Sequence, residues 1–324
     1  MANHVPDWVL QSDVSVWEKD LLEVHGSHEP QWLIEPDGNR TLWLHKDVVS
    51  HYNARLERVI LKGEDWSEII STQVALLLGL PVAETRMCLR NGRRGTISKD
   101  IRPDGFDLHN GLVIMDSVEG YFPHREGAPG SDPARPGVNR PGHTLANIRR
   151  VLEDYAPPPE FSQENLTSFD VFAGYCVLDA LIANRDRHEE NWAVLIPQLT
   201  VYSARLAPSY DHASSLGFNL DDEDRAVKLQ NLRKFAEGGT AGRFEHVGRR
   251  PPTLVSHAAE ALGLCTPEGR DWWLNRIADL DLDPVLRVLE GNQIQTMSDI
   301  EATFAYELLQ LNLRRIQDGA QCHA

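Results

Sequence analysis

The chain has 324 residues, a mass of 36.5 kDa, a formal net charge of −16 and a pI near 5.2. This length allows two lobes that each bury a core, and the negative charge argues against direct nucleic-acid binding, which usually needs a basic face. The four cysteines include no Cys-x-x-Cys pair, and the first residues do not resemble a secretory leader. Every apolar run is shorter than the about 20 residues that span a bilayer. We therefore expect a cytoplasmic protein without a membrane span.

The first part of the chain predicts a small sheet. Residues 1–20 are interpreted as a lead-in, and Gly26 and Ser27 lie in a short loop before the first predicted strand. This loop is a candidate for covering phosphates with its backbone N–H groups, and a plain turn is the alternative. Residues 32–34 and 41–44 flank the turn sequence Pro-Asp-Gly-Asn, which predicts a β-hairpin.

Lys46 ends the second strand of this hairpin. Period-two alternation places it on the same face as Leu42 and Leu44, which we interpret as the inward face. An inward lysine needs an anionic partner. A nucleotide phosphate is one candidate, and Glu68, on a helix predicted over residues 66–79, is another. The alternative is that both residues are solvated surface charges.

Residues 94–101 predict the last strand of this first lobe, which we bound at residues 1–101. Backbone groups between Lys99 and Ile101 are then expected to meet the edge of an adenine. Residues 102–324 are expected to form a second, mainly α-helical lobe. Within it, residues 123–142 are rich in proline, glycine and arginine and predict a mobile loop.

The most informative stretch is residues 184–191, Asn-Arg-Asp-Arg-His-Glu-Glu-Asn. It follows apolar residues over 169–181 that fit one helix face, and it precedes a strand-like run at 192–196. A helix, a polar loop with Asp186 and Asn191, and a strand are the layout of a phosphoryl-transfer catalytic loop. In that chemistry one carboxylate faces the acceptor hydroxyl, and an amide five residues later turns toward a metal on the phosphates.

A second acid follows at the expected place. Asp211 lies 25 residues after Asp186, beyond another strand-like run at 199–202, where a kinase places its second metal carboxylate. The alternative for Asp211 is a turn acid after a proline. Farther on, a basic region from Lys228 to Arg250 includes Arg243. It either reads the substrate or forms a solvated face.

Together these residues resemble the HipA-like serine/threonine kinases, a bacterial group related to eukaryotic protein kinases and phosphoinositide kinases. The resemblance covers most of residues 20–220. The matching segments are Lys46 on its strand, the Glu68 helix, residues 143–148, the Asn-x-Asp-x-His-x-x-Asn loop and residues 208–211.

The resemblance implies an α+β fold with two lobes, a small antiparallel sheet followed by helices, and transfer of the γ-phosphate of ATP to a protein Ser or Thr hydroxyl. It implies Asp186 as the catalytic base, His188 as a supporting residue, Asn191 and Asp211 as Mg²⁺ ligands, and Lys46 on the ATP phosphates. It also implies an antitoxin-type protein partner and autophosphorylation of Ser27. The chain lacks room for the extra amino-terminal subdomain of HipA itself, and His212 follows Asp211 where eukaryotic kinases have phenylalanine.

Three alternatives stay open at this point. The Asp-Arg-His-x-x-Asn pattern also fits a phosphoinositide-type lipid kinase, although the chain has no obvious basic membrane-facing stretch. A small-molecule phosphotransferase of the aminoglycoside type usually has His-Gly-Asp where this chain has Asn-Arg-Asp. The third alternative is a binding protein that keeps the fold without catalysis.

Overall fold

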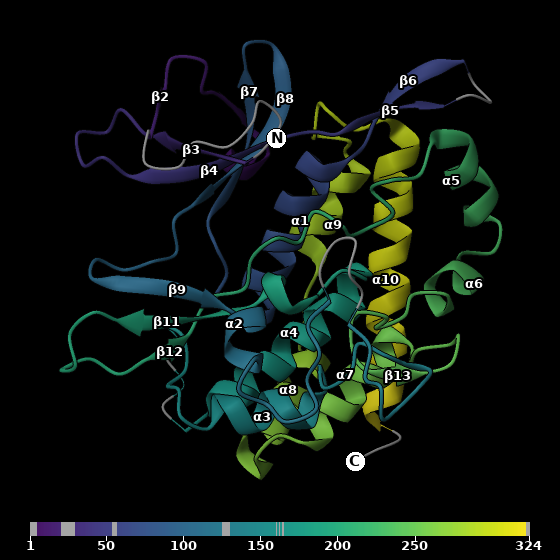
Figure 1. The fold of residues 1–324 in the computed structure, drawn as a ribbon. Coiled ribbons are helices and arrows are strands. Elements are labelled where there is room, and N and C mark those ends of the chain that lie inside the picture. The colour runs from purple at the N-terminus through teal and green to yellow at the C-terminus, as the bar shows by residue number, and fades with distance from the viewer. Residues whose placement is uncertain are drawn as a thin grey trace.

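The structure is a computed structural model that describes residues 5–20, 30–53, 57–124, 130–159, 161, 163 and 165–321. A curled sheet lies at one end of the molecule and a mainly helical body at the other (Figure 1). The predicted α+β class, with a small sheet followed by helices, is confirmed.

The sheet at this end has six strands. All neighbours pair antiparallel except β1 and β7, which pair in parallel. In sheet order the strands are β1 (Gln11–Asp13), β7 (Thr85–Arg90), β8 (Arg93–Lys99), β4 (Leu42–Asp47), β3 (Gln31–Ile34) and β2 (Glu18–Lys19).

The predicted hairpin is confirmed as β3 and β4. Residues 1–20 were wrongly interpreted as a lead-in, because β1 and β2 are strands of the sheet itself. These strands are only two or three residues long, too short for a period-two pattern to be detected.

The two faces of β4 have different partners. Trp43 and His45 are buried, and Trp43 packs into a small core with Leu33 and Ile97. Leu42, Leu44 and Lys46 share the opposite, half-buried face. The predicted common face is therefore confirmed, but it is not the side that packs into this sheet's own core. Lys46 lies on the interior strand β4, on the face of the sheet from which it reaches Asp211.

Helix α1 (Glu64–Leu78) lies against β7 and β8 and continues toward the helical body (Figure 1). Glu64 and Asp65 lie in its first turn, where acids favour the helix dipole. The helix ends at Gly79, which has a φ of 84° and therefore adopts the left-handed C-cap conformation. Its carbonyl ends are further capped by Arg276, whose Nη2 donates to the oxygen of Leu77 at 2.7 Å.

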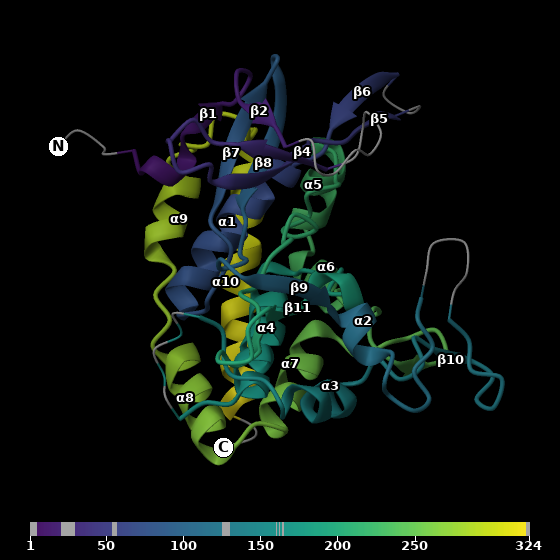
Figure 2. The ribbon, with the colours of Figure 1, turned by 60° about the vertical axis from the view of Figure 1, so that its left-hand side comes forward.

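The second part of the chain is mainly helical. Its helices are α2 (Gly111–Met115), α3 (Leu145–Leu152), α4 (Ser168–Ile182), α5 (Asp222–Leu229), α6 (Leu232–Glu237), α7 (Leu254–Gly263), α8 (Pro267–Ala278), α9 (Asp283–Glu290) and α10 (Asp299–Gln321). Figures 1 and 2 show α4 in the centre of this body with the long α10 beside it. No described helix is both long enough and apolar enough to cross a membrane.

Helix α4 is buried on every side rather than on one face, so the amphipathic interpretation of residues 169–181 was too narrow. Residues all round a central helix contact other helices, which is why its apolar positions exceed one stripe. A capping box fixes its start: the Thr167 side chain accepts from the Asp170 backbone, and Asp170 accepts from the Thr167 backbone at 2.8 Å.

Three smaller sheets are formed by other described residues. Strands β9 (Phe106–Asn110), β11 (Ala193–Pro197) and β12 (Arg205–Leu206) form one, β5 (Ser50–Asn53) and β6 (Arg58–Leu61) another, and β10 (Val138–Asn139) and β13 (His246–Val247) a third. The predicted strand at 192–196 is confirmed as β11. The predicted strand at 199–202 is wrong, because those residues form an exposed turn and pairing resumes only at β12.

Residues 123–142 were predicted to be a mobile loop, but part of this segment forms a paired strand and ion pairs. Figure 2 shows β10 on a loop that extends away from the helical body. Arg135 forms ion pairs with Asp132 at 2.6 Å and with Glu245 at 2.9 Å. These contacts and the pairing of β10 with β13 fix residues 132–142 against the segment around residue 245.

Candidate functional site

The catalytic-loop sequence forms a tight turn at the end of α4. Ala183 closes the helix with a φ of 55°, in the left-handed region that non-glycine residues seldom occupy. The side chain of Asn184 then accepts from the backbone N–H of Asp186 at 3.0 Å. Five residues later, Nδ2 of Asn191 donates to the carbonyl oxygen of Asp186 at 2.7 Å. The predicted pair, Asp186 and Asn191, is thus in direct contact.

A buried ion pair supports this loop from below. Arg187 places Nε and Nη2 on the two carboxylate oxygens of Asp179, each at 2.7 Å. Its Nη1 donates to the carbonyl oxygen of Asn191 at 3.0 Å. Both side chains are buried. Neither residue was predicted as part of the site, although an acid within a largely apolar helix was the available signal.

Lys46 from the six-stranded sheet contacts Asp211 from the second part of the chain. Nζ of Lys46, on β4, lies 2.7 Å from Oδ1 of Asp211, although the two are 165 residues apart in the chain. Asp211 has a φ of 61°, again left-handed for a non-glycine residue. Strained backbone of this kind occurs where the surrounding structure must aim a side chain. The ammonium from the sheet and the acid from the helical body are therefore neighbours.

Charge pairing governs the protonation of these two groups. Burial by itself would lower the pKa of Lys46, but attraction and a hydrogen bond from Asp211 raise it overall. Burial would likewise raise the pKa of Asp211, and the attraction of Lys46 lowers it overall. Both shifts favour the ion pair, so both groups are charged near neutral pH.

Glu68 lies beside this pair but does not form the contact considered for it. Lys46 pairs with Asp211, and Oε1 of Glu68 lies 3.4 Å from Nδ1 of His212 instead. Nε2 of His212 is 2.7 Å from the hydroxyl of Ser209, which accepts from Arg187 at 3.2 Å. A buried polar chain therefore connects α1 to the catalytic loop. Glu68 still acts on Lys46 at a distance, because its negative charge favours the charged ammonium.

The carboxylate of Asp186 is held by an arginine from the basic region. Nε of Arg243 lies 2.7 Å, and its Nη2 2.5 Å, from Oδ1 of Asp186. Oδ2 accepts a longer hydrogen bond from the hydroxyl of Ser214 at 3.4 Å. The sequence analysis noted Arg243 only as one member of a charged stretch. Its contact with Asp186 spans 57 residues and leaves no periodic signal in the sequence.

The other predicted site residues lie around this centre. His188 accepts from the backbone N–H of Glu190 at 3.2 Å, so its ring caps the short 3₁₀ turn at residues 189–191. Lys99 pairs loosely with Glu84 at 3.6 Å. The backbone N–H of Lys99 donates to Glu84, whereas that of Ile101 has no hydrogen-bond partner among the described residues. Gly26 and Ser27 lie outside the described residues.

The donor set suits Mg²⁺ and phosphates. Asn191 uses its Nδ2 on the Asp186 carbonyl, which leaves Oδ1 as an acceptor, and Asp211 uses Oδ1 on Lys46, which leaves Oδ2. Mg²⁺ is commonly held by one or two such oxygens together with substrate phosphates. Within the described ranges no cluster of three or more His, Cys, Asp or Glu side chains is arranged to hold a metal ion. A Mg²⁺ ion held by these two oxygens would take its remaining ligands from phosphate oxygens and water.

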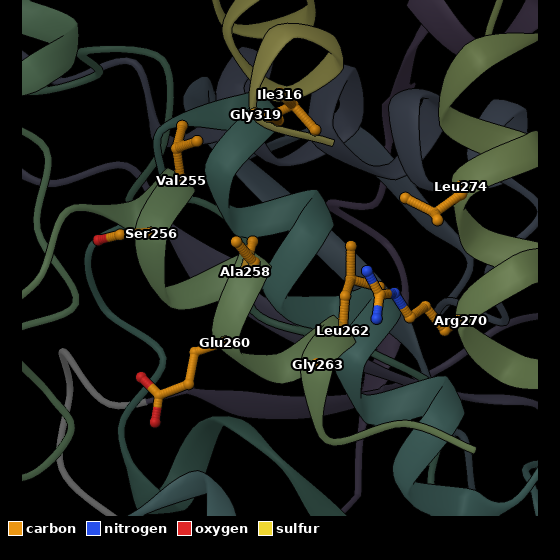
Figure 3. Close-up of a pocket in the computed structure, with 11 residues that line it drawn as sticks. Val255, Ser256, Ala258, Glu260, Leu262, Gly263, Arg270, Leu274, Ile316 and Gly319 are labelled. Carbon is orange, nitrogen blue, oxygen red and sulfur yellow. The ribbon is translucent and has the colours of Figure 1, made fainter. Parts of the chain in front are cut away.

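A separate pocket of about 440 Å³ lies between α7, α8 and α10 (Figure 3). Its walls are mostly apolar and include Leu262, Leu274 and Ile316, with Arg270 and Glu260 also lining it. None of the predicted site residues lines this pocket. We therefore place the candidate site at Lys46, Asp186 and Asp211 rather than here.

No protein-family model and no curated protein matches the sequence. Among solved structures, the chain is similar to the proinflammatory kinase CtkA of Helicobacter pylori. The two share 17% identity with a TM-score of 0.66, over 97% of this chain and 98% of that one. This similarity shows that the chain has a protein-kinase-like fold.

Two further structures are more distant. HipA of Shewanella oneidensis, solved with HipB and operator DNA, shares 13% identity with a TM-score of 0.41, over 92% of this chain and 67% of that one. Hydra Fam20, solved with sugar, shares 10% identity with a TM-score of 0.40, over 96% and 85%. The kinase-like fold rests on the first similarity, and membership of the HipA-like group in particular stays a prediction.

Proposed function

We propose that the chain is an ATP-dependent kinase that transfers the γ-phosphate to a Ser or Thr hydroxyl of a protein. The observation that carries this proposal is the contact of Lys46 with Asp211, since it joins the sheet to the helical body beside the loop of Asp186 and Asn191. An ammonium, two metal-type oxygens and a carboxylate are the groups that phosphoryl transfer requires.

Each residue has a role in this reaction. Lys46 binds phosphate oxygens, and Asn191 and Asp211 hold Mg²⁺, which neutralises charge on the phosphates when it is bound. Asp186 accepts the proton of the acceptor hydroxyl. The acceptor oxygen forms a bond to the γ-phosphorus while the bond from that phosphorus to the β–γ bridging oxygen breaks, and ADP leaves. The backbone N–H of Ile101, at our proposed division between the lobes, donates to the adenine.

Two other predicted residues support the site without touching the reacting atoms. His188 shapes the turn that carries Asn191. Glu68 favours the charge of Lys46 and packs against His212, so it positions the sheet relative to the catalytic loop. An antitoxin-type partner and modification of Ser27 stay predictions from the sequence.

Transfer of labelled phosphate from ATP to proteins of a cell lysate tests the proposal. Asp186→Asn and Asp211→Asn are expected to reduce incorporation by at least about 10³-fold, because each removes a charge that the transition state needs. Asp271→Asn, on the exposed face of α8, is the matched control and is expected to keep wild-type incorporation.

The result is read together with the stability of the variants. Asp186→Asn with wild-type incorporation refutes the role of the carboxylate. Equal melting temperatures for all three variants show that lost activity does not come from unfolding. If labelled phosphate appears on lipid vesicles or on a small molecule and not on protein, the acceptor is not a protein, but the assignment of phosphoryl transfer from ATP still holds.

A further inference from the structure

Two arginines gather beside Asp186, and the proposed chemistry does not use them. Arg243 binds the Asp186 carboxylate directly. Arg140 is joined to the segment of Arg243 through its neighbours Gly142 and His143, which contact Glu245 and the Arg243 carbonyl oxygen. Burial lowers the pKa of the Arg140 guanidinium, the attraction of Glu189 opposes this shift, and the positive charge of Arg243 adds to it. Two like charges held together near a reaction centre repel each other unless an anion lies between or beside them. In the structure Asp186 lies against Arg243 and Glu189 lies near Arg140, so each arginine has one carboxylate beside it.

Arg140 is short of partners. Its side chain is 10% exposed, and its nearest carboxylate is that of Glu189, with Nη1 3.8 Å from Oε2. No hydrogen bond connects its guanidinium to another described residue. A guanidinium has five N–H donors, so Arg140 has donors that an anion can accept from. The backbone of Arg140 also has a φ of 54°, so the chain holds this residue in a strained conformation.

A rigid frame holds both arginines in place. The carbonyl oxygen of Arg243 accepts from Nδ1 of His143 at 2.7 Å, and the next ring, Phe244, stacks on His143 with centroids 4.6 Å apart. Glu245 then accepts from the backbone N–H of Gly142 at 2.6 Å. These contacts connect the segment after Arg140 to the segment of Arg243, so the two backbone segments that carry the arginines are held together before any ligand arrives. Preorganised donors of this kind bind anions with little entropic cost.

We propose that Arg140 and Arg243 form an acceptor subsite for acidic side chains that flank the phosphorylated Ser or Thr. This inference rests on the proposed kinase function and specifies its substrate class. Arginine forks pair with carboxylates through two parallel hydrogen bonds. In the structure Nε and Nη2 of Arg243 both contact Oδ1 of Asp186, so this guanidinium already binds one carboxylate. An acidic residue of the acceptor takes Arg243 from Asp186, and the released carboxylate then receives the acceptor hydroxyl.

Two matched peptides test the subsite. One has a serine flanked by Asp and Glu, and the other has Asn and Gln at the same positions. The measurement is kcat/KM for each peptide at saturating ATP and Mg²⁺. The wild type is expected to prefer the acidic peptide by roughly 100-fold, since two charged pairs contribute about tenfold each. Arg140→Met and Arg243→Met are each expected to reduce this preference about tenfold.

Further variants separate the role of Arg243 from that of charge alone. Arg243→Met frees Asp186 from its partner, so its kcat for the neutral peptide is expected to rise above that of the wild type. Arg140→Lys keeps the positive charge but loses the bidentate hydrogen-bonding geometry of the guanidinium. Its preference for the acidic peptide is therefore expected to lie between those of the wild type and Arg140→Met. Arg249→Met removes an equal charge from the same basic region and is the matched control, with an unchanged preference. KM for ATP is expected to stay constant in every variant.

Three results overturn the subsite. One is a wild type that does not distinguish the peptides, and another is a pair of arginine variants that keep the full preference. The third is a rise in KM for ATP without a change in preference, which would assign the arginines to the nucleotide. If no peptide receives phosphate from the wild type, the proposed function fails. Fluorescence anisotropy of the labelled acidic peptide still tests the subsite, with binding expected to weaken about tenfold in Arg140→Met.

Discussion

The ion pair between Arg187 and Asp179 gives the sharpest prediction about stability. Both side chains are buried, with 2% and 5% exposed, and the pair is bidentate with two contacts of 2.7 Å. Asp179 also accepts from Nδ2 of Asn184 at 2.8 Å. Asp179→Ala leaves a guanidinium charge without a counter-ion inside the protein. Breaking a buried pair in this way costs about 3–5 kcal/mol of unfolding free energy.

This loss is large enough to measure by melting. For a chain of this size it corresponds to a fall in Tm of roughly 5–10 °C. Urea unfolding followed by circular dichroism gives the free energy directly. Glu237→Ala breaks the exposed pair between Arg233 and Glu237, with 74% and 52% of the side chains exposed, and is the matched control. Exposed pairs of this kind contribute on the order of 0.3 kcal/mol.

A double variant separates charge from packing. Asp179→Leu with Arg187→Met replaces the pair by apolar groups, and most of the lost stability is expected to return. Activity is not expected to return, because Arg187 also donates to the carbonyl oxygen of Asn191 and to Ser209. A loss below about 1 kcal/mol in Asp179→Ala would refute the reasoning. So would a double variant that is no more stable than Asp179→Ala.

Three further predictions concern single contacts. Burial lowers the pKa of His257 to about 3. The unfolded chain therefore binds more protons than the folded protein below pH 6.5, and the free energy of unfolding falls as the pH drops, by about 2 kcal/mol at pH 5. His257→Gln should reduce this loss of stability in urea titrations from pH 4 to 7, and an unchanged pH dependence contradicts the prediction. Thr167→Ala removes the cap of α4 and is expected to cost about 1 kcal/mol, measured by urea unfolding, and no loss would show that the capping box with Asp170 is unimportant. Gly174→Ala places a methyl group 2.1 Å from the ring of Trp273, so a loss of about 1–3 kcal/mol is expected, and a Tm equal to that of the wild type would count against this tight packing.

The sequence alone determined the local parts of this protein. Turn residues and period-two alternation predicted the β3–β4 hairpin, and Gly79 predicted the end of α1, because both signals depend on neighbouring residues in the chain. The spacing from Asp186 to Asn191 likewise predicted a polar loop between a helix and a strand, and in the structure the Asn191 side chain donates to the backbone carbonyl of Asp186. Short edge strands such as β1 carry too few residues for such signals.

The tertiary structure decided which charges meet. Lys46 had two carboxylates within reach, and only the fold determines that it pairs with Asp211 while Glu68 lies against His212. Arg243 could not be assigned to Asp186 from the sequence, since the partners come from segments that packing brings together. Ion pairs depend on distance in space, whereas sequence patterns report periodicity along the chain. The sequence therefore suggested candidate residues for the site but not which of their charges pair.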